Sequence, residues 1–426
     1  MQSNYKRLGD YIKEVSIKNT DLKVNNLIGV SIDKKFIKSV ANTIGVDMST
    51  YKIIQKNQLA CKLMSVGRDE KLPVDLYVEE EPSLVSSAYY VFEPIDSNIL
   101  MPEYLKMWLF RSETDRYVGY VSGGDVRGGI SWDTFCDIPI KVPAIEKQQE
   151  IVNEYHTIQN RINLNNQLIA KLEETAQTIY KQWFVDFEFP TESHCEERGT
   201  SDEAISVVGY KSSGGKMVWC VELEKEIPEG WRVGTLGQLC EMIDGDRGAN
   251  YPKNEDFFEN EYCLFLNAGN VTKRGFDFSK CVFIKKEKDQ LLRKGKLKKN
   301  DIVLTSRGTV GNLAFYTDVI PYMNIRINSG MLIIRPRLEA SYLFSMLNSF
   351  EFSKAIENYI SGSAVPQLPI KDLNVIQILL PNDFVMNYFS NIGLTLYKKM
   401  DIIKIQNRKL EELKDLLLAK MTRVES

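Results

Sequence analysis

Two long segments of the chain carry apolar residues at alternating steps of three and four. That spacing is typical of a helix that buries one stripe of side chains against another helix. The pattern predicts a long amphipathic helix within residues 144–190, interrupted at one expected apolar position by Asn165. The apolar positions in this segment are Ile151, Tyr155, Ile158, Ile162, Ile169, Leu172, Ala176, Ile179 and Trp183.

The same stripe returns 238 residues later and predicts a second helix within residues 382–426, in which Asn407 occupies the position that corresponds to Ile169. An exposed apolar stripe is unfavourable in water, so we expect the two helices to pair as an antiparallel coiled coil. Asn165 would then face Asn407, and such a polar layer in an apolar seam can fix the register of the helices. The alternative is that each helix packs only on the body that precedes it.

The stripe is part of a longer internal repeat. The sequence KLEE at residues 171–174 recurs at 409–412, Pro143 corresponds to Pro381 at the same offset, and YVSG at 120–123 corresponds to YISG at 359–362. These matches keep their order along the chain. The sequence therefore predicts two copies of one unit.

Before each long helix, the chain has short apolar runs bounded by Gly, Asn or Pro, such as residues 263–266, 301–305 and 330–334. These runs are typical of strands, and they do not alternate regularly with helices. We therefore predict an α+β fold in which the antiparallel coiled coil of two long helices separates two repeated bodies. The predicted ranges are 1–143 and 227–381 for the bodies, 144–190 and 382–426 for the helices, and 191–226 for a linker.

Composition places the chain among folded globular proteins, because 43% of its 426 residues are hydrophobic and 26% are charged. No apolar run approaches the length that spans a bilayer, and the first residues do not resemble a signal peptide. We therefore predict a cytoplasmic protein with no membrane partner. The seven cysteines form no CxxC pair, which argues against disulfides and against a metal site.

The distribution of charge changes what the net charge of −3 implies. An acidic protein is usually a poor ligand for DNA, because duplex phosphates require Lys and Arg. Residues 273–307, however, hold 12 Lys or Arg against 4 acids, whereas residues 192–226 hold 8 acids against 4 bases. A local basic surface is therefore possible, although the plain alternative is a solvated charged surface.

The sequence contains no recognisable catalytic motif. Its two histidines, His156 and His194, are isolated from the partners that a catalytic triad or a metal cage requires. Phosphate-binding loops, the NPPY-type motif of amino-methyltransferases and the acidic motif of restriction nucleases are also missing. We therefore predict no catalytic residues and favour a binding protein.

Four stretches together resemble the DNA specificity (S) subunit of Type I restriction-modification systems. They are EKQQEIV at 146–152, KLEE at 171–174 leading into QWFVDF at 182–187, IPEGW at 227–231 and GSAVPQL at 362–368. The resemblance implies that residues 1–143 and 227–381 are target-recognition domains, each reading one half of a bipartite site in double-stranded DNA. The helices would be spacers that dock two methyltransferase (M) subunits, and restriction/translocase (R) subunits would join the complex. It also implies a non-catalytic chain that binds no cofactor, with S-adenosylmethionine, ATP and Mg expected on the partner subunits.

Reading DNA requires Arg, Lys, Asn or Gln at base edges and further cations at the phosphates. The predicted DNA-binding residues are Lys62, Arg68 and Arg127 in the first unit and Lys273, Arg274, Arg307, Arg326 and Gln367 in the second. The first unit departs from the pattern, since residues 124–127 read GDVR where residues 363–366 read SAVP. Such a difference suits two domains that read different bases.

Two other functions stay open at this point. The chain could be a self-contained DNA methyltransferase or nuclease with unrecognised motifs, which binding of S-adenosylmethionine by the isolated chain would favour. It could also be a coiled-coil assembly scaffold, for which DNA binding that is absent or independent of sequence would be expected.

Overall fold

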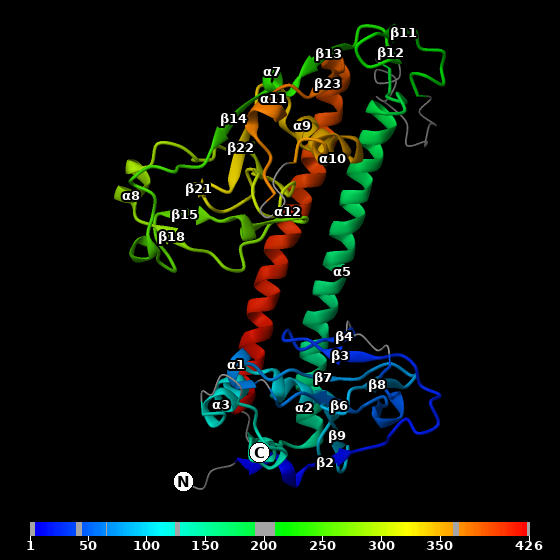
Figure 1. The fold of residues 1–426 in the computed structure, drawn as a ribbon, viewed down its shortest axis with the longest axis vertical. Helices are drawn as coiled ribbons and strands as arrows, with labels where there is room; N and C mark the ends of the chain where they lie inside the picture. Colours follow the sequence, from blue (N-terminus) through cyan, green and yellow to red (C-terminus); the bar gives the residue numbers. More distant parts are fainter. Residues whose placement is uncertain are drawn as a thin grey trace. The chain divides into compact units, whose positions relative to one another are not determined.

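The computed structural model (Figure 1) describes residues 5–39, 45–64, 66–123, 128–191, 209–360 and 366–423. The chain divides into two units. Unit 1 comprises Met1–Asn163 and Lys409–Ser426, and unit 2 comprises Leu164–Arg408. Two long helices, α5 (Ile145–Phe184) and α12 (Asp383–Lys420), lie within the ranges predicted for them. Each of these helices contributes one end to unit 1 and the other end to unit 2.

Unit 1 is built around a four-stranded antiparallel sheet with the order β2-β9-β6-β7. Its strands are β2 (Ile12–Val15), β6 (Leu59–Cys61), β7 (Val74–Leu76) and β9 (Tyr90–Pro94). Three further antiparallel pairs are β1 (Lys6–Arg7) with β10 (Pro139–Ile140), β3 (Ile28–Val30) with β4 (Phe36–Lys38), and β5 (Lys52–Ile54) with β8 (Ser83–Val85). The short helices are η1 (Leu8–Asp10), η2 (Met48–Thr50), α1 (Val66–Asp69), α2 (Pro102–Phe110), α3 (Ser112–Val121) and α4 (Trp132–Cys136).

Local sequence explains where the helices of unit 1 begin. Pro102 occupies the first turn of α2, where its missing N–H costs no helical hydrogen bond. Ser131 caps α4 by accepting a hydrogen bond from the backbone N–H of Thr134. The helices cover the sheet and bury Phe92 and Trp108 in its main core. Burying each such aromatic side chain stabilises the fold by roughly 2–3 kcal/mol.

Unit 2 contains a four-stranded antiparallel sheet with the order β14-β22-β19-β20 and a three-stranded sheet with the order β18-β15-β21. The strands of the first sheet are β14 (Cys240–Asp244), β19 (Ile302–Thr305), β20 (Leu313–Phe315) and β22 (Met331–Pro336). Those of the second are β15 (Cys263–Leu266), β18 (Phe283–Ile284) and β21 (Ile325–Ile327). Two hairpins are β11 (Met217–Cys220) with β12 (Lys225–Pro228) and β16 (Val271–Thr272) with β17 (Gly275–Phe276). β13 (Arg232–Thr235) pairs antiparallel with β23 (Gln377–Leu380), which is distant in the sequence. The short helices of unit 2 are α7 (Leu236–Leu239), η4 (Asn254–Asp256), η5 (Ala268–Asn270), α8 (Lys286–Leu291), α9 (Ala340–Leu347), α10 (Phe350–Glu357) and α11 (Ile370–Asn374). One more short helix, η6 (Met421–Arg423), follows α12 and belongs to unit 1.

The two four-stranded sheets have matching orders when their strands are taken along the chain. In each unit, the first strand of the sheet pairs with the strand that comes last in the sequence. That last strand also pairs with the second strand, which in turn pairs with the third strand at the edge of the sheet. Two helices follow the last strand. α2 and α3 follow β9 in unit 1, and α9 and α10 follow β22 in unit 2. The predicted α+β class is confirmed.

The long helices contribute directly to the core of each unit. In unit 2, Tyr180 and Phe184 of α5 share a core with Tyr342 of α9 and Phe389 of α12. In unit 1, Tyr155 of α5 lies in the core that also holds Leu418 of α12 and Met421. Each core therefore combines both helices with the body of its own unit, so the helices do not pack only on each other.

Within unit 2, the two long helices run in opposite directions. Trp183, near the end of α5, stacks on Tyr388, near the start of α12. Asn165, which lies earlier in α5, contacts Asn407, which lies later in α12. The Asn165 Nδ2 atom donates to Asn407 Oδ1 at 2.7 Å, and Asn407 Nδ2 donates to Asn166 Oδ1 at 2.9 Å. Asn165 is 4% exposed and lies among mostly apolar residues, and the hydrogen bond to Asn407 gives its buried amide a partner. The contact is the one expected from the sequence, and its effect on register stays a prediction.

We predict that Asn165→Leu alone destabilises the protein more than the double replacement of Asn165 and Asn407 by Leu. The single change leaves the Asn407 amide poorly paired, at a cost of about 1–3 kcal/mol, whereas the double change removes both polar groups. Urea unfolding of the four chains of this double-mutant cycle measures the coupling. Asn160→Leu, at an exposed position of the same helix, is the matched control. Additive effects of the two changes would contradict the prediction.

Candidate functional site

Two loops of unit 2 meet beyond the end of strand β19. The backbone N–H of Gly308 donates to the carbonyl of Pro366 at 3.0 Å, and the N–H of Leu368 donates to the carbonyl of Ser306 at 3.0 Å. Residues 306–308 and 366–368 thus form a short antiparallel contact, which we call the unit 2 junction. Gly308 has a φ of +77°, a conformation that favours glycine, so the chain can turn directly after the contact.

The unit 2 junction brings together two predicted DNA-binding residues that are far apart in the sequence. Arg307 and Gln367 are directly opposite each other, and Arg307 Nη2 lies 3.4 Å from Gln367 Oε1. Gln367 is exposed and Arg307 is half-buried. Arg is the usual partner of guanine and Gln of adenine in the major groove, so this pair has the chemistry of direct base readout.

Unit 1 has a similar meeting of loops after strand β6. The N–H of Ile130 donates to the carbonyl of Leu63 at 3.1 Å, and the N–H of Gly67 donates to the carbonyl of Gly128 at 3.1 Å. We call this contact the unit 1 junction. A side chain at Gly129 would place its Cβ 2.7 Å from the Leu63 carbonyl oxygen, so this close approach of backbones requires glycine.

The predicted residues of the first unit surround the unit 1 junction unevenly. Lys62 precedes it and is half-buried, whereas Arg68 follows it and is exposed. The Arg68 guanidinium is paired with its neighbour Asp69 at 2.7 Å. Arg127 lies outside the described residues. An exposed apolar residue that a search for cations did not find, Met64, directly follows Leu63 of this junction.

Lys273 and Arg274 do not belong to the unit 2 junction. They form the turn of the β16–β17 hairpin, and both are exposed. On the other side of the hairpin, Lys404 of α12 donates to the carbonyl of Arg274 at 2.5 Å. The five residues predicted in the second unit therefore occupy three separate places.

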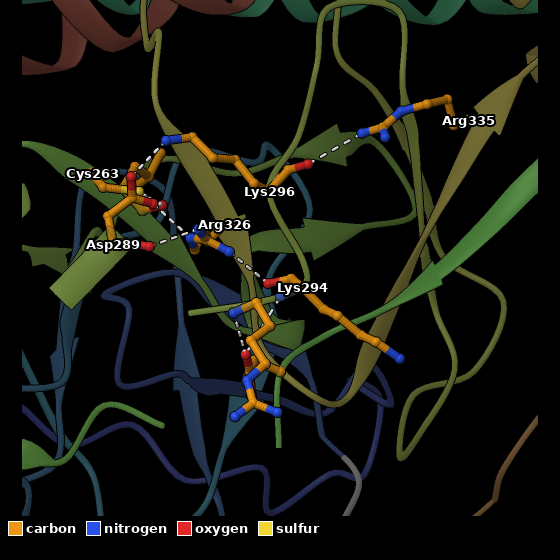
Figure 2. Close-up of polar contacts among 9 residues, drawn as sticks. Cys263, Asp289, Lys294, Lys296, Arg326 and Arg335 are labelled. Atoms are coloured by element: carbon orange, nitrogen blue, oxygen red, sulfur yellow. Dashed lines mark hydrogen bonds and ion pairs between the residues drawn. The ribbon is translucent and has the colours of Figure 1, made fainter. Parts of the chain in front are cut away.

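The prediction for Arg326 requires a correction. Arg326 lies in strand β21 and is only 5% exposed. Figure 2 shows that its guanidinium is turned inward, where Nε donates to Asp289 Oδ1 at 2.6 Å and Nη1 donates to the Lys294 carbonyl at 2.7 Å. A guanidinium engaged in this way inside the domain does not reach a base edge. Arg326 is a buried structural residue, and the sequence carries no signal of this, because alternation along a strand would place Arg326 on the face opposite Ile325 and Ile327.

Asp289 is the centre of this buried network. Its side chain is 3% exposed and contacts both Arg326 and Lys296 Nζ, the latter at 2.5 Å. Burial on its own would raise the pKa of Asp289, but hydrogen bonds from the two cations outweigh it and hold the pKa below its ordinary value. Nearby, Arg335 pairs with Asp301 at 2.8 Å and also donates to the Lys296 carbonyl (Figure 2). Within residues 273–307, the charge of Lys296 is therefore used inside the domain.

Two further properties concern the described part of the chain. Within it, no group of three or more His, Cys, Asp or Glu side chains is placed to hold a metal ion. Among the same residues, no helix has the length and apolar content that crossing a membrane requires.

Comparison with known proteins gives a consistent family assignment. Residues 75–174 and 228–414 match the family described as the Type I restriction modification DNA specificity domain. The chain is similar to the Type I restriction enzyme HindI specificity subunit of Haemophilus influenzae, with 24% identity over 97% of each chain. It is also similar to the MjaIX specificity subunit of Methanocaldococcus jannaschii, with 24% identity over 76% of this chain and 68% of that protein.

A solved structure supports the fold. The crystal structure of a Type-I restriction-modification system S subunit from M. genitalium matches with a TM-score of 0.54. The match covers 99% of this chain and 96% of that chain, at 13% identity. At such low identity, the similarity concerns the fold alone.

The buried position of Arg326 leads to a prediction about stability. Removing one partner of a buried ion pair costs about 3–5 kcal/mol, and because Lys296 remains beside Asp289, we expect Arg326→Met to cost about 3 kcal/mol. Because the pKa of Asp289 is lowered in the folded state, the pair stabilises the fold above the ordinary pKa of the carboxyl. The stability that this ion pair provides is lost only as the pH falls through the lowered pKa of Asp289. The difference in free energy of unfolding between the two proteins should therefore be constant between about pH 5 and pH 8.

Chemical denaturation of both proteins across this pH range measures the effect. Arg293→Met, an exposed position within residues 273–307, is the matched control and should change the free energy of unfolding little. An Arg326→Met protein with undiminished stability would show that the buried network does not hold the domain together.

Proposed function

The chain belongs to the family of the Type I restriction modification DNA specificity domain, and from this membership we propose that it selects the DNA sequence for a Type I restriction-modification complex. The observation that carries the proposal is that the family match includes parts of both units, each of which has a junction of two loops. A protein that reads two short sequences needs two such surfaces.

We propose that the two units are target-recognition domains that arose by duplication and that each reads one half of a bipartite site. The matching strand orders support a common origin. The junctions support different specificities, because Arg307 and Gln367 in unit 2 have no identical counterparts in unit 1. A duplicated scaffold with different side chains at the same place can read different bases.

In unit 2, the proposed readout is made by Arg307 with Gln367. Both side chains carry planar groups that can form two hydrogen bonds to one base edge. Their backbones are tied together, so their side chains start from fixed positions, and less conformational entropy is lost on binding. Their mutual contact of 3.4 Å is long for a hydrogen bond and leaves both groups available to DNA.

The proposed role of α5 and α12 is to act as an antiparallel coiled-coil spacer between the recognition domains. A helix of this length extends about 60 Å at 1.5 Å per residue, and its stiffness would fix the gap between the two half-sites. We further propose that the helices dock two methyltransferase subunits and that restriction subunits join that complex. In this proposal, S-adenosylmethionine, ATP and Mg bind to those partners, and the present chain performs no chemistry.

We predict that Arg307→Ala relaxes recognition at one base pair of one half-site. Loss of a bidentate contact to a base costs about 1–3 kcal/mol of discrimination, while the other half-site should be read as before. Mapping of methylated adenines in cells that carry either chain measures this preference. Arg232→Ala, an exposed change in β13 of the same unit, should leave the recognised sequence unchanged. Methylation by the purified chain without partners would contradict the proposed division of labour.

A second prediction concerns the gap between the half-sites. Inserting four residues at facing positions of α5 and α12 lengthens the pair by about one helical turn, or 5.4 Å. Because DNA rises about 3.4 Å per base pair, the gap should grow by one or two base pairs while both half-sites keep their sequences. The same mapping of methylated adenines reveals the new gap. An unchanged gap would argue against the spacer role.

A further inference from the structure

The turn of the β16–β17 hairpin in unit 2 is tightly organised. Between the strands, the backbone N–H of Arg274 donates to Thr272 Oγ1 at 3.1 Å, and the same hydroxyl donates to the carbonyl of Gly275 at 3.1 Å. Gly275 has a φ of +89°, which side-chain-bearing residues rarely adopt. The turn therefore has one preferred shape, and Lys273 and Arg274 project from it.

Lys273 and Arg274 differ from several other cations of residues 273–307, which we call the basic stretch. Lys296 is paired with Asp289, Lys288 is paired with Asp256, and Lys299 donates to two carbonyls while lying over the ring of Tyr316. Among the described residues, the side chains of Lys273 and Arg274 have no ion-pair or hydrogen-bond partner. Their charges are therefore available to a ligand.

The turn is supported from two sides. Lys404 of α12 donates to the Arg274 carbonyl, and Thr317 donates to Asp401 of the same helix at 2.6 Å, so the Asp401 carboxylate is engaged beside the turn. On the sheet side, Asn312 Nδ2 donates to the Val271 carbonyl at 2.9 Å. Asn312 ends the loop that begins with Arg307, so this single loop joins the hairpin to the unit 2 junction.

We propose that the turn formed by residues 272–275, which we call the basic turn, grips a phosphate of the DNA backbone and sets the position from which Arg307 and Gln367 read the bases. This inference rests on the proposed function and assigns Lys273 and Arg274 to phosphate contact in place of base readout. Cations at phosphates supply affinity without sequence information, while the register they impose determines which base each reading residue meets. The loop from Arg307 to Asn312 connects the two tasks.

A hairpin of unit 1, β3–β4, also carries cations in its turn but uses one of them differently. The β3–β4 turn also carries two adjacent cations, Lys34 and Lys35. Lys34, however, is only 7% exposed and donates to the Leu109 carbonyl at 2.9 Å while pairing with Asp115 at 2.7 Å. Burial lowers the pKa of Lys34, and Asp115 opposes this effect only in part. Lys34 is therefore engaged inside unit 1, whereas Lys273 and Arg274 are both exposed.

Salt titration of DNA binding tests the proposal. The assembled methyltransferase complex, carrying either the natural chain or the double variant Lys273→Ala/Arg274→Ala, is titrated with a duplex holding its site and with an unrelated duplex. Each lost phosphate contact lowers the slope of log K against log salt by about 0.9, so the double variant should lose about 2 from its slope. Its affinity for both duplexes should fall by the same factor. Because both residues are exposed, the melting temperature should not change.

Two further variants separate this site from net charge. Lys285→Ala/Lys286→Ala removes the same charge from two adjacent exposed lysines of the same stretch that lie over the rings of Phe258 and Tyr262, and it should change the slope much less. Gly275→Ala keeps both cations but disturbs the turn and should reduce the slope. Three outcomes would each contradict the proposed phosphate contact. They are an unchanged slope in the Lys273/Arg274 variant, an equal loss of slope in the Lys285/Lys286 variant, and a loss of affinity confined to the specific duplex. If the natural complex itself fails to distinguish the two duplexes, the proposed function fails instead.

Discussion

Apolar packing of the two long helices against the body of each unit is the interaction on which the rest of the structure depends. In unit 2, Phe184 of α5 lies against Phe389 of α12 and Tyr342 of α9, with ring centroids about 5 Å from it. The same core includes one face of the four-stranded sheet. The sheet carries the loops of the junction at its end, so those loops are positioned by the helices through a continuous layer of buried side chains.

The junctions use backbone hydrogen bonds for position and leave side chains free for recognition. In unit 2, the two bonds that define the contact involve only main-chain atoms of residues 306–308 and 366–368. Arg307 and Gln367 can therefore be exchanged for other residues without loss of those bonds. In unit 1, Gly129 is the exception, because a side chain there would collide with the Leu63 carbonyl. This separation of backbone contacts from exposed side chains suits the proposed reading of different bases by the two units.

The sequence predicted those features that depend on periodicity. The stripe from Ile151 to Trp183 is long and regular, so it identified α5, and antiparallel pairing of the two repeated helices placed Asn165 opposite Asn407. Charge was a weaker guide, because an isolated sequence does not show where a cation points. Arg326 has the same composition signal as Arg307, but a buried carboxylate of Asp289, distant in the sequence, turns it inward. The division of each helix between two units was also not predicted, since it depends on which body each half of the helix contacts.

The arrangement of unit 1 has a consequence for how the protein is made. Unit 2 is one continuous stretch, whereas unit 1 needs residues from both before and after it. During translation, residues 1–163 emerge before unit 2, and the core of unit 1 lacks Leu418 and Met421 until all of unit 2 has been synthesised. Tyr155 and its neighbours on α5 would therefore be exposed in the nascent chain, where chaperones or proteases can detect them. A chain that stops short of Leu418 would leave this part of the unit 1 core uncovered.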